Sequence, residues 1–337
     1  MATTPEPAEH LLDGLNLPLL RARVTLRLME DATLPEYKGA MLRGGFGYAF
    51  QRASCPVSCW GHSHDCTIAG LCAYRQVFET PRPSGVEWLH DLRDVPRPFV
   101  IVPPSDTRTR YKAGEALEFG LVLIGHGIEY LPYFLYGFDR LSSMGLGRAH
   151  ARGKLERLET LLAWEPAGQI IYQDGRTLSA AEPLPLIDTR MVQARAALLP
   201  ADLRLTLHTP LRLKTRGSIL KRLDPPSLIH AICWRLSALA AFHGEHPWPV
   251  DYRRFVDAAR GVRIESEQIR WLDLLRTSTR GSAPHTMPQG GIIGSAIMRN
   301  VSEELRALVV LGSLVHVGKA CTFGHGGYRV EGIEGLG

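Results

Sequence analysis

The sequence lacks the features that would carry a protein into or across a membrane. It has no run of 18 or more apolar residues. Its first residues, MATTPEPAEHLLDG, show neither a basic start nor an apolar stretch typical of a secretion signal. We therefore expect a cytoplasmic protein with no membrane partner. With 337 residues, 45% of them hydrophobic, the chain is long enough for two domains, each with its own core.

The usual nucleotide-binding glycine patterns are also missing. A P-loop places its glycines after a strand and before a helix. Here the glycine-rich stretch VHVGKACTFGHGGYRVEG, residues 315–332, follows a helix-like apolar run and leads into a strand-like one. This order argues against mononucleotide chemistry. Glycines still let a backbone approach a ligand closely, and the interspersed Lys319, His325 and Arg329 suit an anion such as a phosphate chain.

The net positive charge of the chain is small, and it is unevenly distributed. The formal net charge is only +5, yet residues 201–337 hold 18 lysines and arginines against 12 acidic residues. The basic excess therefore belongs to the second half of the chain. Many of these cations are arginines, whose planar fork suits phosphate oxygens.

The hydrophobic pattern predicts the element order β, α, β, β, α, β in the first half. The expected strands are 17–29, 98–104, 116–125 and 154–164, and the expected helices are 38–53 and 128–144. The second half follows a similar order, with strands at 203–214, 290–298 and 328–332 and helices at 228–244 and 302–317. This is the order of the ferredoxin-like split βαβ unit.

We therefore predict an α+β protein with two tandem ferredoxin-like, or RRM-like, domains. Residues 1–178 would form the first domain and 203–337 the second, and the Pro- and Ala-rich stretch 179–202 would link them. In both halves a helix leads into a basic glycine loop and then a strand.

Four of the six cysteines crowd into one insert of the first domain, residues 55–72, with the spacing C-x3-C-x6-C-x5-C: Cys55, Cys59, Cys66 and Cys72. Without a secretion signal, such a cluster indicates a metal site before disulfides. We expect a structural zinc ion, with His62 or His64 able to replace one thiolate. An iron-sulfur cluster is the rival, and four reduced cysteines in a loop are the plain alternative.

In several segments the sequence resembles the CRISPR precursor-RNA processing endoribonucleases of the repeat-associated mysterious protein superfamily. The resemblance covers nearly the whole chain and is carried by KGAMLRGGFGYAF, LCAYRQVFETP, LIGHGIEYLPYFLYGFDRLSSMGLGRAHARG, TPLRLKTRG, RWLDLLRTSTRG, GGIIGSA and VHVGKACTFGHGGYRVEG. It implies binding of CRISPR repeat RNA and one cut per repeat of the precursor. It also implies that the mature guide RNA is retained and that other CRISPR effector subunits are partners.

The resemblance further implies that the C-terminal glycine segment lies along the RNA, with its amides and cations facing phosphates. The residues expected to bind RNA are Arg43, His316, Gly318, Lys319, Gly324, His325, Gly326, Gly327 and Arg329. The structural alternatives are that the glycines form turns and that His316 caps a helix C-terminus.

The resemblance also implies cleavage without a metal, because RNA carries its own nucleophile, the 2′-oxygen. The enzyme must move a proton to and from the reacting oxygens and offset charge on the phosphorane. Family members commonly supply a histidine near the first helix, and residues 38–53 contain none. We therefore expect Tyr48 or His64 to transfer the proton, and Lys38 or Arg52 to offset the charge. The missing histidine leaves open a protein that binds repeat RNA without cutting it.

Overall fold

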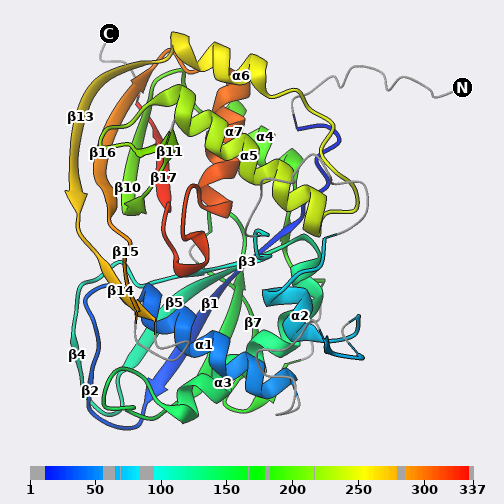
Figure 1. The fold of residues 1–337 in the computed structure, drawn as a ribbon, viewed down its shortest axis with the longest axis vertical. Coiled ribbons are helices and arrows are strands. Elements are labelled where there is room, and N and C mark those ends of the chain that lie inside the picture. The colour runs from blue at the N-terminus through cyan, green and yellow to red at the C-terminus, as the bar shows by residue number, and fades with distance from the viewer. Residues whose placement is uncertain are drawn as a thin grey trace, which may run out of the picture.

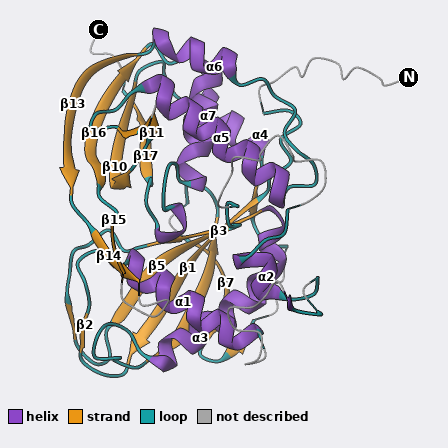
Figure 2. Cartoon of the chain, viewed as in Figure 1, coloured by secondary structure: helices purple, strands orange, loops and turns teal. Residues whose placement is uncertain are grey.

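The computed structural model describes most of the chain, in the ranges 12–55, 65–68, 70–82, 95–165, 167–178, 183–215, 217–278 and 285–333. The described residues form two halves, each built from a sheet and helices, which lie one above the other in Figure 1. The same view coloured by secondary structure shows both helical layers (Figure 2).

The first half, at the bottom of Figure 1, is built on one antiparallel sheet. Its strands are β1 (Leu19–Leu28), β3 (Phe99–Val102), β5 (Ala116–Ile124), β6 (Gly153–Leu161), β7 (Gly168–Gln173), β8 (Arg176–Thr177) and β9 (Leu186–Ile187). They lie in the order β3-β5-β1-β6-β7-β8, and β9 pairs with β1. Its helices are α1 (Gly39–Ser54), α2 (Ala73–Phe78) and α3 (Leu131–Met144), with the 3-10 helix η4 (Gly125–Tyr130) before α3.

Apolar and polar side chains alternate along β1, and the apolar side chains mark the face of the sheet that the helices cover. Leu20, Val24 and Leu26 are fully buried in the same core as the aromatic residues of α1 and α3. In that core, Phe46 of α1 lies 4.5 Å, centroid to centroid, from Phe138 of α3. The residues between these apolar positions point to the other side, so the two helices cover only one face.

On the open face of the first sheet, basic residues are paired with acidic ones. Arg23 lies 3.3 Å from Glu159, and Arg27 donates a 2.7 Å hydrogen bond to Glu156. Much of the positive charge on this face is thus already neutralised within the protein.

The second half repeats the topology of the first. Its sheet is formed by β10 (Leu203–Leu211), β13 (Arg263–Leu272), β16 (Gly291–Arg299) and β17 (Tyr328–Gly332), in the antiparallel order β13-β16-β10-β17. This is the order β3-β5-β1-β6 of the first half with each strand replaced by its counterpart. The main helices are α5 (Pro225–His243) and α7 (Glu303–Val315). The prediction of two tandem ferredoxin-like units is confirmed.

Shorter elements complete the described chain. They are the paired strands β2 (Ala32–Thr33) and β4 (Arg110–Tyr111), β11 (Lys214–Thr215) and β12 (Ser218–Ile219), and β14 (Leu275–Ser278) and β15 (His285–Pro288), with the helices α4 (Thr189–Ala197), α6 (Arg253–Ala258), η5 (Ala259–Gly261) and η6 (Cys321–Phe323). Among the residues described, no helix is long and apolar enough to cross a bilayer.

The stretch predicted as a linker, 179–202, is more than a connection. It contains β9, which extends the first sheet, and α4, whose Val192 and Ala196 are buried in the core of the second half. Asp188 caps α4 by accepting a 2.9 Å bond from the amide of Met191. Because its residues pack on both halves, this stretch fixes the halves to each other.

Apolar residues of the first half also enter the second core. Leu19, Val100 and Ile124 belong to the same buried cluster as Leu207 and Val315. The two units therefore share a hydrophobic boundary, which we call the seam.

Candidate nucleic-acid interface

The glycine segment 316–327 descends from the second half into the seam, as the red loop above α1 in Figure 1. Tyr37, just before α1, donates a 2.8 Å hydrogen bond to the carbonyl of Phe323. At Gly324, whose φ is +81°, a Cβ would overlap Pro103 of the first half and lie 2.7 Å from the Ile101 carbonyl. The glycine is thus required for close contact between the two halves.

The structure buries the central residues of this segment, whose backbone was expected to face RNA. His316, Gly324, His325, Gly326 and Gly327 are all buried. The amides of Gly324, Gly326 and Gly327 bond inside the protein. That of Gly326 donates to the Pro210 carbonyl at 2.9 Å, and that of Gly327 to Thr209 Oγ1 at 2.7 Å. In this conformation these groups have no surface to offer a phosphate.

The buried histidines of the segment are held as neutral rings. His316 Nδ1 lies 3.1 Å from the Gly324 carbonyl and 3.0 Å from the His325 carbonyl, so this nitrogen carries the proton and donates it. Burial lowers the pKa of His316 to about 3 and that of His325 to about 4. A neutral imidazole offers a phosphate no charge, so both residues serve the fold of the segment.

The cations at the edge of the segment remain accessible. Lys319 is exposed, and its amide donates a 3.1 Å bond to the carbonyl of Arg212. Gly318 beside it is partly exposed, with φ +90°. Arg329 is exposed on β17, on the open face of the second sheet, and its acidic neighbour Glu331 is 4.0 Å away. Lys319 and Arg329 therefore stay candidates for phosphate contact.

A stack of one aromatic ring and two guanidinium groups crosses the seam. The guanidinium carbon of Arg43, on α1, lies 5.5 Å from the centroid of the Phe323 ring. That of Arg276, on β14, lies 4.4 Å from the same ring. The hairpin of β14 and β15 reaches down from the second sheet toward the start of α1 (Figure 1). Two cations from different halves thus meet at one residue of the glycine segment.

We call the residues gathered here the seam cluster: Arg43, Arg212, Arg276, Lys319 and Phe323. Arg212 donates a 2.5 Å bond to the Pro288 carbonyl at the end of β15, which ties the cluster to the hairpin. Lys319 is exposed and the other four are partly exposed. Two guanidinium groups at a partly exposed ring, with Arg212 and Lys319 on the adjoining backbone, suit a phosphate chain with its bases.

Of this cluster, only Arg43 and Lys319 are predicted from the sequence as site residues. Arg276 lies in the segment RWLDLLRTSTRG and Arg212 in TPLRLKTRG, which carried the resemblance without being assigned a role. No spacing along the chain connects them. They meet because a hairpin returns to the seam, which is a tertiary contact that periodicity cannot reveal.

The candidate catalytic residues occupy different places along α1. Tyr48 is 46% exposed, and the guanidinium carbon of Arg52 lies 4.6 Å from the centre of its ring. The two residues are one turn apart on the same helix face. His64 falls outside the described residues, so its position relative to this pair stays a prediction.

Lys38 does not fit the expected role. Its side chain is fully buried at the start of α1, and its Nζ donates to the carbonyls of Glu36 and Asp106 at 3.3 Å and to Asp106 Oδ1 at 3.4 Å. An amine enclosed in this way cannot reach a phosphorane at the surface. In this conformation Lys38 anchors the loop that follows β3.

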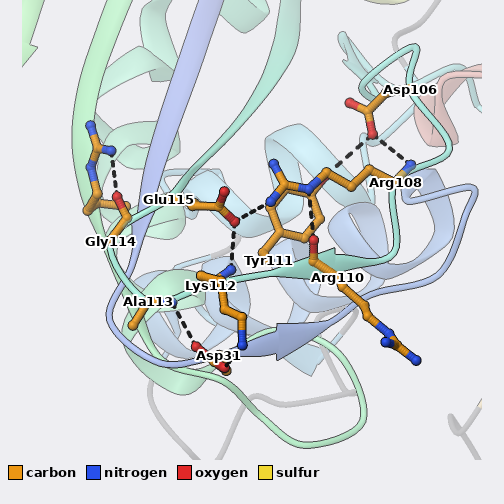
Figure 3. Close-up of polar contacts among 10 residues, drawn as sticks. Asp31, Asp106, Arg108, Arg110, Tyr111, Lys112, Ala113, Gly114 and Glu115 are labelled. Carbon is orange, nitrogen blue, oxygen red and sulfur yellow. Dashed lines mark hydrogen bonds and ion pairs between the residues drawn. The ribbon is translucent and has the colours of Figure 1, made fainter.

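That loop is held by a network of charged residues (Figure 3). Asp106 Oδ1 accepts a 2.9 Å bond from the amide of Arg108, whose guanidinium stacks 4.4 Å over Tyr111 and also donates to Glu115. Burial raises the pKa of Tyr111 to about 12, so its hydroxyl keeps its proton. The guanidinium of Arg110 points away from the network (Figure 3) and is exposed.

Three of the four clustered cysteines lie within the described residues, and Cys59 lies outside them. Cys55 follows the last residue of α1, Cys72 precedes the first of α2, and their Sγ atoms are 3.6 Å apart. Over the described ranges, no group of three or more histidine, cysteine or acidic side chains converges on one point. The four-cysteine site therefore stays a prediction.

Comparison with known families gives two matches that together run through most of the chain. Residues 205–328 match the family of the CRISPR-associated endoribonuclease Cas6, and residues 17–184 match a family described as an N-terminal domain, AF_1859_N. A relative from Archaeoglobus fulgidus, an uncharacterized protein, is 25% identical over 323 residues, which cover 94% of this chain and 99% of the relative.

Solved structures share the fold. A Cas6 product complex superposes with a TM-score of 0.53 at 16% identity, covering 94% of this chain and 100% of that one. Thermus thermophilus Cas6 gives 0.51 at 15% identity, covering 94% and 99%. A partial Cas6-RT-Cas1–Cas2 complex gives 0.57 at 16% identity, and there the match covers 94% of this chain but only 46% of the larger one. The Cas6 family thus matches part of the second half of the chain, and the solved Cas6 structures share its fold over most of its length.

Proposed function

We propose that this protein binds CRISPR repeat RNA at the seam cluster and cuts the precursor transcript once within each repeat. The observation that carries the proposal is the stack of Arg43 and Arg276 on Phe323, where both halves present cations at one surface. The match of residues 205–328 to the family of the CRISPR-associated endoribonuclease Cas6 supports RNA as the ligand. The protein would act in the cytoplasm, where the transcript is made.

The cleavage we propose uses the RNA 2′-oxygen as nucleophile and requires no metal ion. The 2′-hydroxyl loses its proton, its oxygen attacks the adjacent phosphorus, and the 5′-oxygen leaves with a proton. The products are a 2′,3′-cyclic phosphate and a 5′-hydroxyl end. Tyr48 or His64 would move protons, worth roughly 10²- to 10⁴-fold in rate. Arg52 would offset charge on the phosphorane.

The position of Tyr48 is compatible with this role. It follows Arg43 by five residues on α1, which is about 7.5 Å along the helix axis. At about 100° per residue, however, Tyr48 lies about 140° around the helix from Arg43, so an RNA strand held at Arg43 would have to cross over α1 to reach Tyr48 and Arg52, whose ring and guanidinium are in contact.

A second candidate function is RNA binding without cleavage, as a scaffold subunit of a CRISPR effector complex. Two observations favour it. Helix α1 contains no histidine, and the amine of Lys38 is buried. The bound repeat RNA would then be held uncut, and other effector subunits would supply the nuclease.

One experiment separates the two. An end-labelled repeat transcript is incubated with purified protein in EDTA, beside a transcript of scrambled sequence. Site-specific cutting that leaves an end resistant to phosphatase until acid opens the cyclic phosphate supports cleavage. Replacing the 2′-hydroxyl at the cut site by hydrogen should then abolish cutting and leave binding intact. A gel shift without any product favours the scaffold, and no shift at low salt contradicts both.

A further inference from the structure

We propose that the turn between α3 and β6, residues 147–150, forms a second phosphate site for the transcript together with Arg110 of β4. The proposal rests on the function proposed above, because it extends the path of the same RNA. In the first half this turn takes the place of the glycine segment, between the helix and the strand that correspond to α7 and β17. It lies beside β2 at the bottom of Figure 1.

The backbone of the turn is closed at its base and open at its tip. Leu146 and Ala151 exchange two backbone hydrogen bonds, of 2.9 and 3.0 Å, and Arg148 and Ala149 at the tip are exposed. Within the described part of the chain, the amides of Gly147, Arg148 and Ala149 have no hydrogen-bond acceptor. Consecutive free amides in a turn bind anions. The glycine segment of the second half offers no such surface, because its amides bond inside the protein.

Two exposed arginines meet at these amides. Arg148 belongs to the turn itself. Arg110 pairs with Thr33 of β2, and a Cβ on Gly147 would lie 2.8 Å from the Thr33 carbonyl, so β4 and the turn are neighbours. The guanidinium of Arg110 points away from the charged network of its own loop (Figure 3). Arginine is the side chain best shaped to grip phosphate oxygens.

The charge of these two arginines is not neutralised by the described residues, among which neither forms an ion pair. The acidic residues on the surrounding segments already have partners: Glu115 pairs with Arg108, Asp31 with Lys112 and Glu30 with Arg152. His150 adds an exposed ring donor and is held at φ +52°, a conformation that is rare for a residue with a side chain. Such a conformation at an exposed tip is often kept for binding.

A short segment joins this site to the seam cluster. Thr33 contacts the turn at Gly147, and Tyr37 donates its hydrogen bond to the carbonyl of Phe323 in the seam cluster. The four residue steps from Thr33 to Tyr37 span at most about 14 Å of extended chain. A few nucleotides cover that length, so one RNA strand is able to contact both sites.

The test uses the full chain and the salt dependence of transcript binding. Arg110→Ala with Arg148→Ala should reduce the slope of log K against log salt by about 1.4, because two phosphate contacts of about 0.7 each are lost. Arg110→Lys with Arg148→Lys keeps both charges and should restore the wild-type slope. Arg176→Ala with Arg190→Ala is the matched control: it removes two exposed arginines from β8 and α4 and should leave the slope unchanged.

Transcript length gives a second measurement. As the repeat transcript is shortened from either end, one step should cost the wild type the same slope and cost the alanine variant none. The proposal is overturned if Arg110→Ala with Arg148→Ala keeps the wild-type slope, or if the matched control loses as much. The proposed function still stands in that case, provided that Arg276→Ala with Lys319→Ala flattens the slope. A wild-type protein that binds no transcript at low salt contradicts the proposed function, and this proposal with it.

Discussion

Phe323 contacts two guanidinium groups that come from different halves of the chain. Each contact of this type contributes about 0.5 to 1 kcal/mol at an exposed site and up to about 2 kcal/mol when water is excluded. The two like charges near one ring also repel each other. A phosphate bound beside both guanidinium groups would offset that repulsion, so the arrangement suits an anion even though it contributes to docking of the halves.

We expect Arg276→Ala combined with Lys319→Ala to weaken binding of the repeat transcript and to flatten its salt dependence. Each phosphate contact that is lost should reduce the slope of log K against log salt by about 0.7 for a single strand. Filter binding over a range of salt concentrations measures this.

The matched control for that double variant is Arg260→Ala, which removes an exposed arginine beyond α6, at the far end of the second half (Figure 1). Its slope should equal that of the wild-type protein. The Arg329→Ala variant tests whether the open face of the second sheet also binds the transcript. If Arg329→Ala alone flattens the slope while the double variant does not, the seam cluster is not the phosphate site.

Lys38→Met tests the structural role of the buried amine. The substitution removes the charged donor to the carbonyls of Glu36 and Asp106, and a hydrogen bond to a charged group contributes about 1.5 to 3 kcal/mol. Chemical denaturation should show that loss of stability. The single-turnover cleavage rate of the folded protein should not change.

The comparison for Lys38→Met is Lys112→Ala, which removes an exposed lysine paired with Asp31. It should leave the denaturation curve almost unchanged, because solvent screens such pairs. A tenfold or larger loss of cleavage rate in Lys38→Met at full stability would restore a catalytic role for this residue.

At the scale of elements, the glycine segment works as a docking surface between the halves. Its glycines with positive φ, Gly318, Gly324 and Gly326, let the chain turn where a side chain would collide with backbone or with Pro103. The segment thus contributes to the candidate RNA site only indirectly. It fixes the seam, and the seam brings Arg43 and Arg276 together.

We expect Gly324→Ala to destabilise the protein, because the added Cβ would overlap Pro103 and the left-handed φ is unfavourable for alanine. Gly44→Ala is the matched control. This exposed glycine of α1 has no atom within 4 Å of an added Cβ, and alanine should stabilise the helix by up to about 1 kcal/mol. Urea denaturation of both variants measures these changes in the free energy of unfolding. Equal stability of Gly324→Ala and the wild type would contradict this account of the seam.

Local sequence patterns predict the elements well where one face of an element is apolar. Periodicity predicts β1, α3 and α7 to within a few residues. Each of them buries one face, so its apolar residues recur with the period of a strand or a helix. Strand β13, RIESEQIRWL, is not predicted, since most of its side chains are polar and its pairing with β16 supplies the structure.

The candidate site is predicted less well, for a physical reason. His316 and Gly324 fall on the positions of a family motif, but the burial of this segment depends on Pro103 and Tyr37, which are more than 200 residues away in the chain. The glycine pattern could not distinguish a backbone that approaches RNA from one that approaches another domain, because both need the same lack of side chains.

At the scale of the whole molecule, three buried neutral histidines lie where the halves meet. Burial lowers the pKa of His243 to about 4, as it does that of His325, and the pKa of His316 falls to about 3. His243 Nε2 also lies 2.5 Å from the carbonyl of Pro96, in the first half. Protonation of any of these rings would place an uncompensated charge in the seam.

The free energy of unfolding should therefore fall on acidification. A histidine in the unfolded chain has a pKa near 6.5. Below that pH the unfolded chain therefore binds protons that the buried histidines of the folded protein do not bind. The contribution of these histidines is fully present above pH 6.5 and is lost progressively down to about pH 3, the folded pKa of His316, by up to about 1.4 kcal/mol per pH unit for each histidine. Denaturation at a series of pH values measures the slope.

His325→Phe should make that slope shallower. The ring keeps its edge contact with Tyr37, 5.1 Å between centroids, but can no longer be protonated in the unfolded state. His246→Phe, at an exposed position, should leave the slope of the wild-type protein almost unchanged. Identical slopes in the wild type and His325→Phe would mean that acid acts elsewhere.

The paired arginines on the open face of the first sheet have a consequence for how a long polyanion would arrive. Because Arg23 and Arg27 are paired with Glu159 and Glu156, the first half attracts a polyanion only weakly. Residues 201–337, in contrast, carry an excess of six positive charges. The molecule thus has an electric dipole directed between its two units. In dilute salt a transcript would be turned during its diffusive approach, meeting the second unit first and reaching α1 only afterwards.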